Sequence, residues 1–195
     1  MRGANQSSSR AEPDAAETVL RFVNTRADGG GRSDVFARSA DFAGWAAEHE
    51  LLAADTVVSE SDAVAARELR DALITVLLAH SGDPAIDAAE VGAAERYLGQ
   101  AGTRYPLTAR ITATGARLVA GSTGVPGVLG QVLAAVTELA QRDEWTRIKA
   151  CCNPSCHSGF VDRTRNRAGR YCCAGCGSRV SMRAMRQRRR DSGVR

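Results

Sequence analysis

All six cysteines of the 195-residue chain lie between positions 151 and 176. They form two groups: Cys151-x4-Cys156, then fifteen intervening residues, then Cys172-x3-Cys176. Two close pairs about 15 residues apart are typical of a four-thiolate structural zinc site. Zinc supplies folding free energy that a segment of ~30 residues cannot obtain from its own core. The spacing therefore predicts one structural zinc ion, held by Cys151, Cys156, Cys172 and Cys176.

Two further cysteines leave the ligand set open. Cys152 with Cys156, and Cys173 with Cys176, also have suitable spacings, and His157 offers a nitrogen. Disulfides, or a redox-active or nucleophilic cysteine, are the alternatives to a metal. The polar start of the chain shows no secretory signal, so we expect a cytoplasmic protein, in which disulfides are disfavoured. A catalytic zinc is disfavoured because such sites usually keep only three protein ligands.

The two parts of the chain carry opposite charge. Positions 1–146 contain 13 Arg and 20 Asp or Glu, a net charge of −7, and positions 147–195 contain 12 Arg, one Lys and two Asp, a net charge of +11. An acidic body with a basic end indicates a polyanionic partner for that end. The hydrophobic share of 44% excludes wholesale disorder. No apolar run approaches the ~20 residues of a membrane span, so we expect no membrane partner.

Apolar periodicity predicts a mostly helical body with a little sheet. The predicted helices cover 15–25, a segment capped by Ser39 or Asp41, 61–79, a segment from Asp83-Pro84 to about position 98, and 126–140 with room to continue through Trp145 and Ile148. Alternation of Leu107, Ala109, Ile111 and Ala113 predicts a β-hairpin over 104–120, and a helix over 181–190 follows the cysteines.

These elements place the chain in the α+β class. We expect a mostly helical N-terminal domain with a small β-hairpin, and then a small C-terminal zinc-ribbon or treble-clef-like finger followed by a basic helix. The predicted organisation is a disordered tail over 1–12, the N-terminal domain over 13–149, the finger and basic helix over 150–190, and a tail over 191–195. Near Lys149 the charge balance and the cysteine content both change.

The sequence around the cysteines resembles a known family. The segments that carry the resemblance are Arg147-Ile-Lys-Ala-Cys-Cys-Asn-Pro-Ser-Cys156, Phe160-Val-Asp162-Arg-Thr164-Arg-Asn166, Arg170-Tyr171-Cys172 and Cys176-Gly-Ser-Arg179. They are similar to the CGNR-type zinc finger of bacterial transcription regulators, and this resemblance implies the first ligand set above. Ser178 replaces the Asn of the family's C-G-N-R, Tyr171 stands where Trp is common, and the second pair is spaced x3 where x4 is frequent.

The start of the body resembles the ABATE domain, which typically precedes this finger. Leu20-Arg-Phe22-Val-Asn24-Thr25 is similar to the domain's L-x-F-x-N-T opening, and Trp45 in a short helix also fits. Together the two resemblances span most of positions 17–190. They imply a stress-linked transcription regulator with a DNA-binding finger and an N-terminal domain that has a sensory or ligand-binding role. Dimerisation is a further possible role of this domain.

Arginines crowd the basic end. The candidates for nucleic-acid contacts are Arg163, Arg165, Arg167 and Arg170 between the cysteine pairs, and Arg179, Arg183, Arg186 and Arg190 after them. The last four recur at steps of four, three and four, which places them on one helical face. Guanidinium groups bind phosphate or guanine in a bidentate manner, so DNA is the predicted partner. A solvated basic tail without a specific partner is the alternative.

Candidate ligand contacts in the body are few. The resemblance suggests Asn24 and Thr25, although local chemistry favours these two side chains as caps of a helix end. We expect Trp45 in the core and a structural role for His80.

No catalytic motif is present, so we do not expect an enzyme. The first hypothesis is a DNA-binding transcription regulator, working as a homodimer on two half-sites and responding to an unknown small-molecule effector. The second is a small-molecule-binding protein or enzyme whose basic finger only localises it on nucleic acid. The third is a protein-interaction finger that meets an acidic surface.

Overall fold

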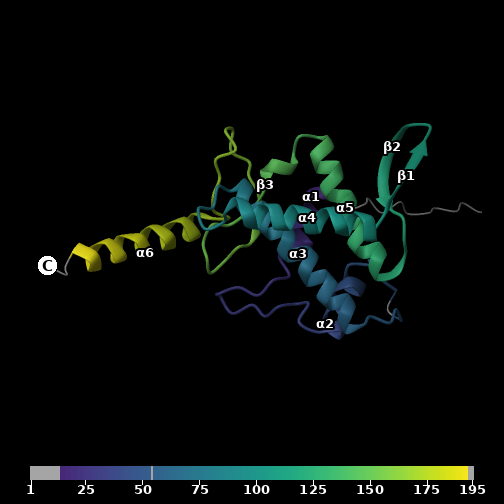
Figure 1. Ribbon diagram of the computed structural model, residues 1–195, viewed down its shortest axis with the longest axis horizontal. Coiled ribbons are helices and arrows are strands. Elements are labelled where there is room, and N and C mark those ends of the chain that lie inside the picture. The colour runs from purple at the N-terminus through teal and green to yellow at the C-terminus, as the bar shows by residue number, and fades with distance from the viewer. Residues whose placement is uncertain (1–13, 54, 193–195) are drawn as a thin grey trace, which may run out of the picture.

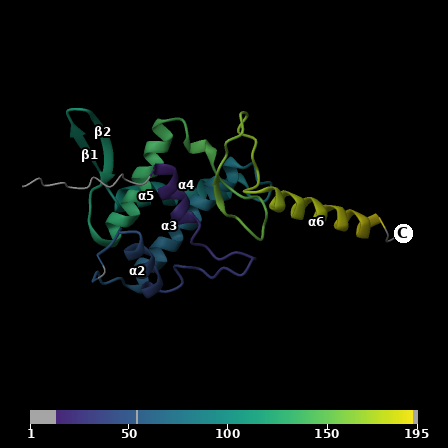
Figure 2. The ribbon, with the colours of Figure 1, turned by 180° about the vertical axis from the view of Figure 1, so that it is seen from behind.

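The computed structural model describes residues 14–53 and 55–192. The tail predicted over 1–12 lies outside the described residues. The elements follow the order α1 (Ala15–Val23), α2 (Ser39–Glu48), α3 (Glu60–His80), α4 (Ala88–Arg104), β1 (Leu107–Thr112), β2 (Gly115–Ala120), α5 (Gly124–Gln141), η1 (Trp145–Arg147), β3 (Ile148–Ala150), β4 (Gly159–Val161) and α6 (Ala174–Ser192). In both ribbon views α6 stands away from the body at one end of the long axis, and the hairpin β1–β2 projects at the other (Figures 1 and 2). This arrangement confirms the α+β class.

The core lies between α1, α3 and α5. Its fully buried side chains include Val19, Phe22, Leu69, Leu73, Leu77 and Leu129. Beside α2 an aromatic cluster closes the core, in which neighbouring rings of Phe22, Phe36, Phe42 and Trp45 have centroids 4.9 to 6.2 Å apart. Such contacts add to the hydrophobic stabilisation of the buried rings. Trp45 is therefore a core residue, as predicted.

An ion pair between a buried arginine and a half-buried aspartate fixes the loop between α1 and α2. The Arg70 side chain on α3 is 2% exposed and donates two hydrogen bonds to the Asp34 carboxylate, at 2.7 and 2.8 Å. Burial by itself would raise the pKa of Asp34, but the hydrogen bonds from Arg70 hold this pKa below its usual value. Because the guanidinium group binds in a bidentate manner, the end of the loop has one orientation relative to α3.

The predicted start of α4 is wrong. Asp83 accepts a hydrogen bond from the N–H of Ala85 in a turn, and the helix begins at Ala88. Asp87 and Glu90 form a capping box there, in which each side chain accepts the other residue's backbone N–H. Two reciprocal caps hold the helix start at this point, five residues after Asp83.

Two further expectations for helices are also wrong. Neither Ser39 nor Asp41 caps α2, because the N-cap position belongs to Arg38, which makes no side-chain cap. The helix α5 does not continue through Trp145 and Ile148. It ends at Gln141, since Asp143 has a φ of +56°, which an α-helix cannot contain.

The predicted β-hairpin is present, and its strands pair from Leu107↔Ala120 to Thr112↔Gly115. Its far end extends beyond the body, so Ile111 is 78% exposed although it belongs to the apolar side of the alternating pattern. The alternation therefore predicted the strand correctly without predicting burial.

The strand β3 belongs to the core of the body. Ile148, Lys149 and Ala150 are each at most 2% exposed. At the end of α3, His80 Nδ1 donates to the Ile148 carbonyl at 2.9 Å and Ser81 Oγ donates to the Ala150 carbonyl at 2.6 Å. Burial lowers the pKa of His80, which favours the neutral ring in this structural role. None of the helices in the described part of the chain is long and apolar enough to cross a membrane.

Candidate metal centre and nucleic-acid interface

Four of the six cysteine sulfurs converge on one point. The Sγ atoms of Cys151, Cys156, Cys172 and Cys176 all lie within 4.8 Å of one another. The separation is 3.7 Å between Cys156 and Cys172 and 3.8 Å between Cys172 and Cys176. Four sulfurs at ~2.3 Å from a tetrahedral zinc ion lie about 3.8 Å apart, so the cluster has the size and chemistry that zinc requires.

The elements of the C-terminal segment explain this convergence. Cys151 directly follows β3, and Cys156 lies in the turn that leads to β4. Cys172 precedes α6, and Cys176 lies in its first turn. A β-hairpin with one ligand pair and a helix start with the other form a treble-clef-like finger, as predicted.

Hydrogen bonds around the sulfurs orient the ligands. Asn153 Nδ2 donates to Cys176 Sγ at 3.4 Å, and Ser158 Oγ lies 3.2 Å from Cys156 Sγ. The backbone N–H of Cys156 also bonds the Asn153 carbonyl at 2.8 Å, which closes the turn. Such outer contacts fix ligand geometry and stabilise negative charge on sulfur.

The thiols of this cluster repel one another when ionised. Burial raises the pKa of Cys151 to about 11. Burial and the neighbouring Cys151 also raise the pKa of Cys172. For Cys156, burial is outweighed by hydrogen bonds from Ser158, and its pKa is lowered. A divalent cation relieves the repulsion, because each ligand binds as a thiolate.

The other two cysteines lie outside the cluster. Cys152 is buried and points to the end of α3, with its Sγ 3.7 Å from the Ser81 carbonyl oxygen. Cys173 is exposed. The ring of His157 faces the body, where its Nδ1 lies 3.1 Å from an Arg26 nitrogen. The geometry thus selects the ligand set Cys151, Cys156, Cys172 and Cys176 among the alternatives.

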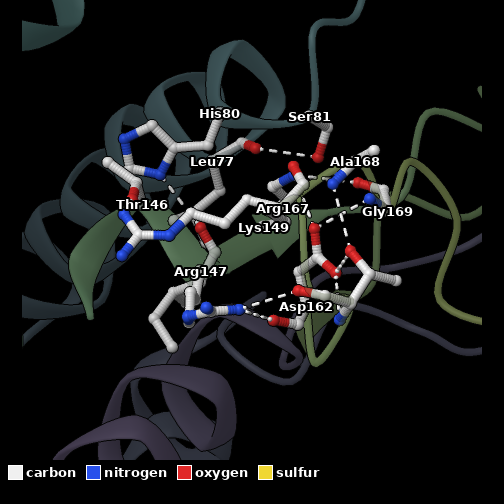
Figure 3. A network of polar contacts seen from close by, with 12 residues as sticks. Leu77, His80, Ser81, Thr146, Arg147, Lys149, Asp162, Arg167, Ala168 and Gly169 are labelled. Carbon is white, nitrogen blue, oxygen red and sulfur yellow. Dashed lines mark hydrogen bonds and ion pairs between the residues drawn. The ribbon is translucent and has the colours of Figure 1, made fainter. Parts of the chain in front are cut away.

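A buried ion pair organises the loop between β4 and α6. Lys149 Nζ donates to Asp162 Oδ2 at 2.8 Å and to the Gly169 carbonyl at 3.1 Å (Figure 3). Both side chains of the pair are at most 3% exposed. Asp162 also accepts bonds from the Thr164 N–H and hydroxyl, at 2.9 and 2.6 Å, and from the Gly169 N–H at 2.8 Å. Although burial opposes ionisation, these bonds hold the pKa of Asp162 well below its usual range.

Figure 3 shows how neighbouring basic residues fasten the same loop. Arg147 donates to the carbonyl oxygens of Asp162 and Thr164, each at 3.0 Å. Arg167 bonds Asp143 at 2.7 Å, which ties the loop to the end of α5. The loop that carries four of the predicted arginines is therefore held in one shape by contacts at its base.

The finger is joined to the body at a second place. Asn24 Oδ1 accepts the Gly159 N–H at 2.7 Å, and Asn24 Nδ2 donates to the Gly159 carbonyl at 3.3 Å. Thr25 Oγ1 donates to the Phe22 carbonyl at 2.6 Å and so caps α1. The two candidate ligand residues thus have intramolecular partners. Thr25 has the capping role that local chemistry favours, and Asn24 instead binds the finger.

The eight predicted nucleic-acid contacts fall into two groups. Three have partners within the chain: Arg167 binds Asp143, Arg170 donates to the Gly82 carbonyl, and Arg183 donates to Ser155 Oγ. The other five are exposed and have no hydrogen bond or ion pair with any described residue: Arg163, Arg165, Arg179, Arg186 and Arg190. These five guanidinium groups are open to an external anion.

Sequence reasoning missed two functional features of this region. Lys149 is the only lysine of the chain, and Asp162 is one of two acids in the basic end. Because each residue is rare in this segment and the two carry opposite charge, an ion pair between them could have been predicted. The contact of Asn24 with Gly159 has no comparable signal in the sequence, because it joins residues 135 positions apart.

The fold and the thiol cluster define a zinc-finger protein in which the finger is built onto a helical domain. The chain belongs to the ABATE family, described as "Putative stress-induced transcription regulator", whose model matches residues 16–142. Residues 147–189 match the CGNR zinc finger. Both resemblances noted in the sequence are confirmed, in the expected order. No curated protein matches the chain.

Proposed function

We propose that this protein is a transcription regulator that binds double-stranded DNA with α6 and the loop between β4 and α6. The family description supports a role in regulation. The observation that carries the DNA contact is the set of unpartnered arginines on a helix that stands away from the body (Figure 1).

The shape of α6 suits a DNA groove. Its 19 residues span about 28 Å, and a helix of ordinary width fits the major groove of ~12 Å. Six arginines lie on it, and its one carboxylate, Asp191, accepts a hydrogen bond from Gln187. The zinc ion fixes the start of the helix through Cys172 and Cys176, so the arginines project from a rigid base.

The test is binding of the zinc-loaded protein to genomic DNA fragments at near-physiological salt, followed by affinity measurements at several salt concentrations. The variant Arg186→Ala/Arg190→Ala removes two guanidinium groups without removing an intramolecular contact. We expect weaker binding and a salt slope reduced by about 2, since each phosphate contact contributes about 1. Enrichment of fragments with a shared motif would establish sequence-specific readout.

The control carries the same change of charge elsewhere. Arg96→Ala/Arg104→Ala removes two exposed arginines of α4, a helix outside the proposed interface. Equal losses of DNA affinity in the two double variants would refute the proposed interface. Binding of an acidic protein without binding of DNA would favour the protein-interaction hypothesis instead.

The remaining features of the proposal follow from this role. We propose that the protein works in the cytoplasm without catalysing a reaction. A homodimer would present two helices to two half-sites, which raises specificity beyond that of one finger. An effector that binds the body and changes DNA affinity would make the protein a sensor, whereas a metabolite that is turned over would favour the enzyme hypothesis.

A further inference from the structure

The loop between α1 and α2 reaches the finger directly. In both ribbon views it extends from the body toward the finger (Figures 1 and 2). The Gly29 N–H donates to the Ser155 carbonyl at 2.8 Å. A Cβ atom at Gly29 would come within 2.8 Å of Ser155 Cβ, so only glycine permits this approach. The turn between Cys151 and β4 is thus covered by the body.

The same turn also contacts the arginine face of α6. Both terminal nitrogens of Arg183 lie 3.1 Å from Ser155 Oγ. Arg183 shares its helical face with Arg179 and Arg186. This face is therefore turned to the side of the molecule on which the loop lies. Ser155 joins the two elements, with its carbonyl bound to the loop and its hydroxyl bound to the helix.

The loop brings its own basic groups to this surface. Arg26 lies 3.1 Å from His157 Nδ1 and forms no ion pair with a carboxylate among the described residues. Arg32 lies 3.3 Å from Ser158 Oγ, and its charge is balanced by Asp28 at 2.8 Å. One guanidinium group of the body that forms no ion pair with a described carboxylate thus lies at the same turn that Arg183 of α6 contacts.

We propose that Arg26 and the loop around it belong to the same DNA-binding surface as α6, so that the body and the finger contact one duplex together. A duplex whose backbone follows Arg179, Arg183 and Arg186 toward the base of the helix meets Arg26 next. A guanidinium group has five N–H donors, and the contact with His157 uses one of them, so Arg26 can also bind a phosphate oxygen. This inference rests on the proposed DNA binding by α6.

The experiment compares Arg26→Gln with Arg96→Gln in the full-length, zinc-loaded protein. Glutamine at position 26 removes the charge but retains an N–H donor for His157. We expect Arg26→Gln to weaken DNA binding several-fold and to lower the salt slope by about 1, whereas Arg96→Gln leaves both unchanged. Zinc content and unfolding temperature serve as a check that the fold is intact. Arg26→Lys keeps the charge and should keep the salt slope.

The outcomes separate this inference from the function on which it rests. If Arg186→Ala/Arg190→Ala loses affinity but Arg26→Gln behaves like Arg96→Gln, the body does not contact DNA and the inference is wrong. If no arginine of α6 matters either, the proposed DNA interface itself fails. If Arg26→Lys loses as much DNA affinity as Arg26→Gln in a folded protein, the side chain stabilises the turn and does not contact DNA. This result would also overturn the inference.

Discussion

The side-chain amide of Asn24 pairs with both backbone groups of Gly159, accepting its N–H at 2.7 Å and donating to its carbonyl at 3.3 Å. An amide placed in this way imitates a neighbouring strand along the free edge of β4. The body therefore supplies the partner that the two-stranded β3–β4 sheet lacks, at a position next to the metal cluster. The geometry makes Asn24 a structural link between the two parts of the chain.

Replacing Asn24 with Ala should lower the free energy of unfolding by about 1–3 kcal/mol, because both groups of Gly159 lose their partner in a partly buried place. Chemical denaturation measures this change. Asn166→Ala is the matched control, since Asn166 is exposed and its side chain makes no hydrogen bond with a described residue. Equal stabilities of the two variants would argue against the link.

The approach of the loop to the finger predicts different effects of alanine at two adjacent glycines. Gly29→Ala forces the loop away from Ser155 and should cost about 1–2 kcal/mol through the lost hydrogen bond. Gly30→Ala meets only the carboxylate of Asp28, at 3.2 Å, which can shift. Denaturation curves together with hydrogen exchange of the residue 29 amide test this difference. A greater loss at Gly30 would contradict the described packing.

The Lys149–Asp162 pair should be far more important for stability than an exposed pair. Lys149→Met leaves the Asp162 carboxylate buried without its cation, and we expect a loss of about 3–5 kcal/mol. Asp143→Asn removes the charge from the exposed pair with Arg167, keeps a residue type tolerated at the φ of +56°, and should leave stability nearly unchanged. Thermal unfolding of both variants measures the difference, and similar unfolding temperatures would show that the buried pair does not hold the loop.

The ligand set predicts opposite results for two adjacent cysteines. Cys172→Ser removes one of four sulfurs and should abolish tight zinc binding, whereas Cys173→Ser should keep one zinc ion per chain because its side chain is exposed outside the cluster. Measuring the zinc content of the purified variants shows which of the two cysteines is a ligand. Zinc in the first variant and none in the second would mean that the alternative pair is correct.

Zinc binding should release protons and weaken as the pH falls. The pKa of Cys151 is raised to about 11, so this thiol is protonated at neutral pH without the metal and must lose its proton to bind. Each lower pH unit therefore adds to the cost of forming the thiolates. Calorimetry of zinc binding in buffers of different ionisation enthalpy counts the protons, and a count of zero would exclude thiolate ligation.

The metal site was largely predictable from the sequence, and its attachment was not. Ligand spacing is a local property that indicated a four-thiolate site, and the resemblance to the CGNR finger implied Cys151, Cys156, Cys172 and Cys176 among the alternatives that spacing left open. Long-range contacts such as Asn24 with Gly159 depend on how whole elements pack, which no local pattern records. The same limit applies to Arg183, which periodicity placed correctly on the α6 face but whose bond to Ser155 required the fold.

Helix boundaries show the same division. The periodicity of the segment from 61 to 79 lies within α3, because its apolar face is continuous. The predicted start of α4 was wrong because two aspartates offered an N-cap. Asp87 has a reciprocal partner in Glu90, whereas Asp83 has none, so the helix begins after Asp87. The predicted end of α5 was wrong because the left-handed backbone conformation of Asp143 cannot be inferred from the apolar pattern.

The burial of β3 has a consequence for any attempt to transplant the finger. A graft that begins at the first cysteine would leave Ile148, Lys149 and Ala150 behind, and with them the cation that holds Asp162. A graft that includes them would carry a strand whose natural cover, the end of α3, stays with the donor. The finger therefore depends for part of its support on the domain before it, and neither boundary separates the two cleanly.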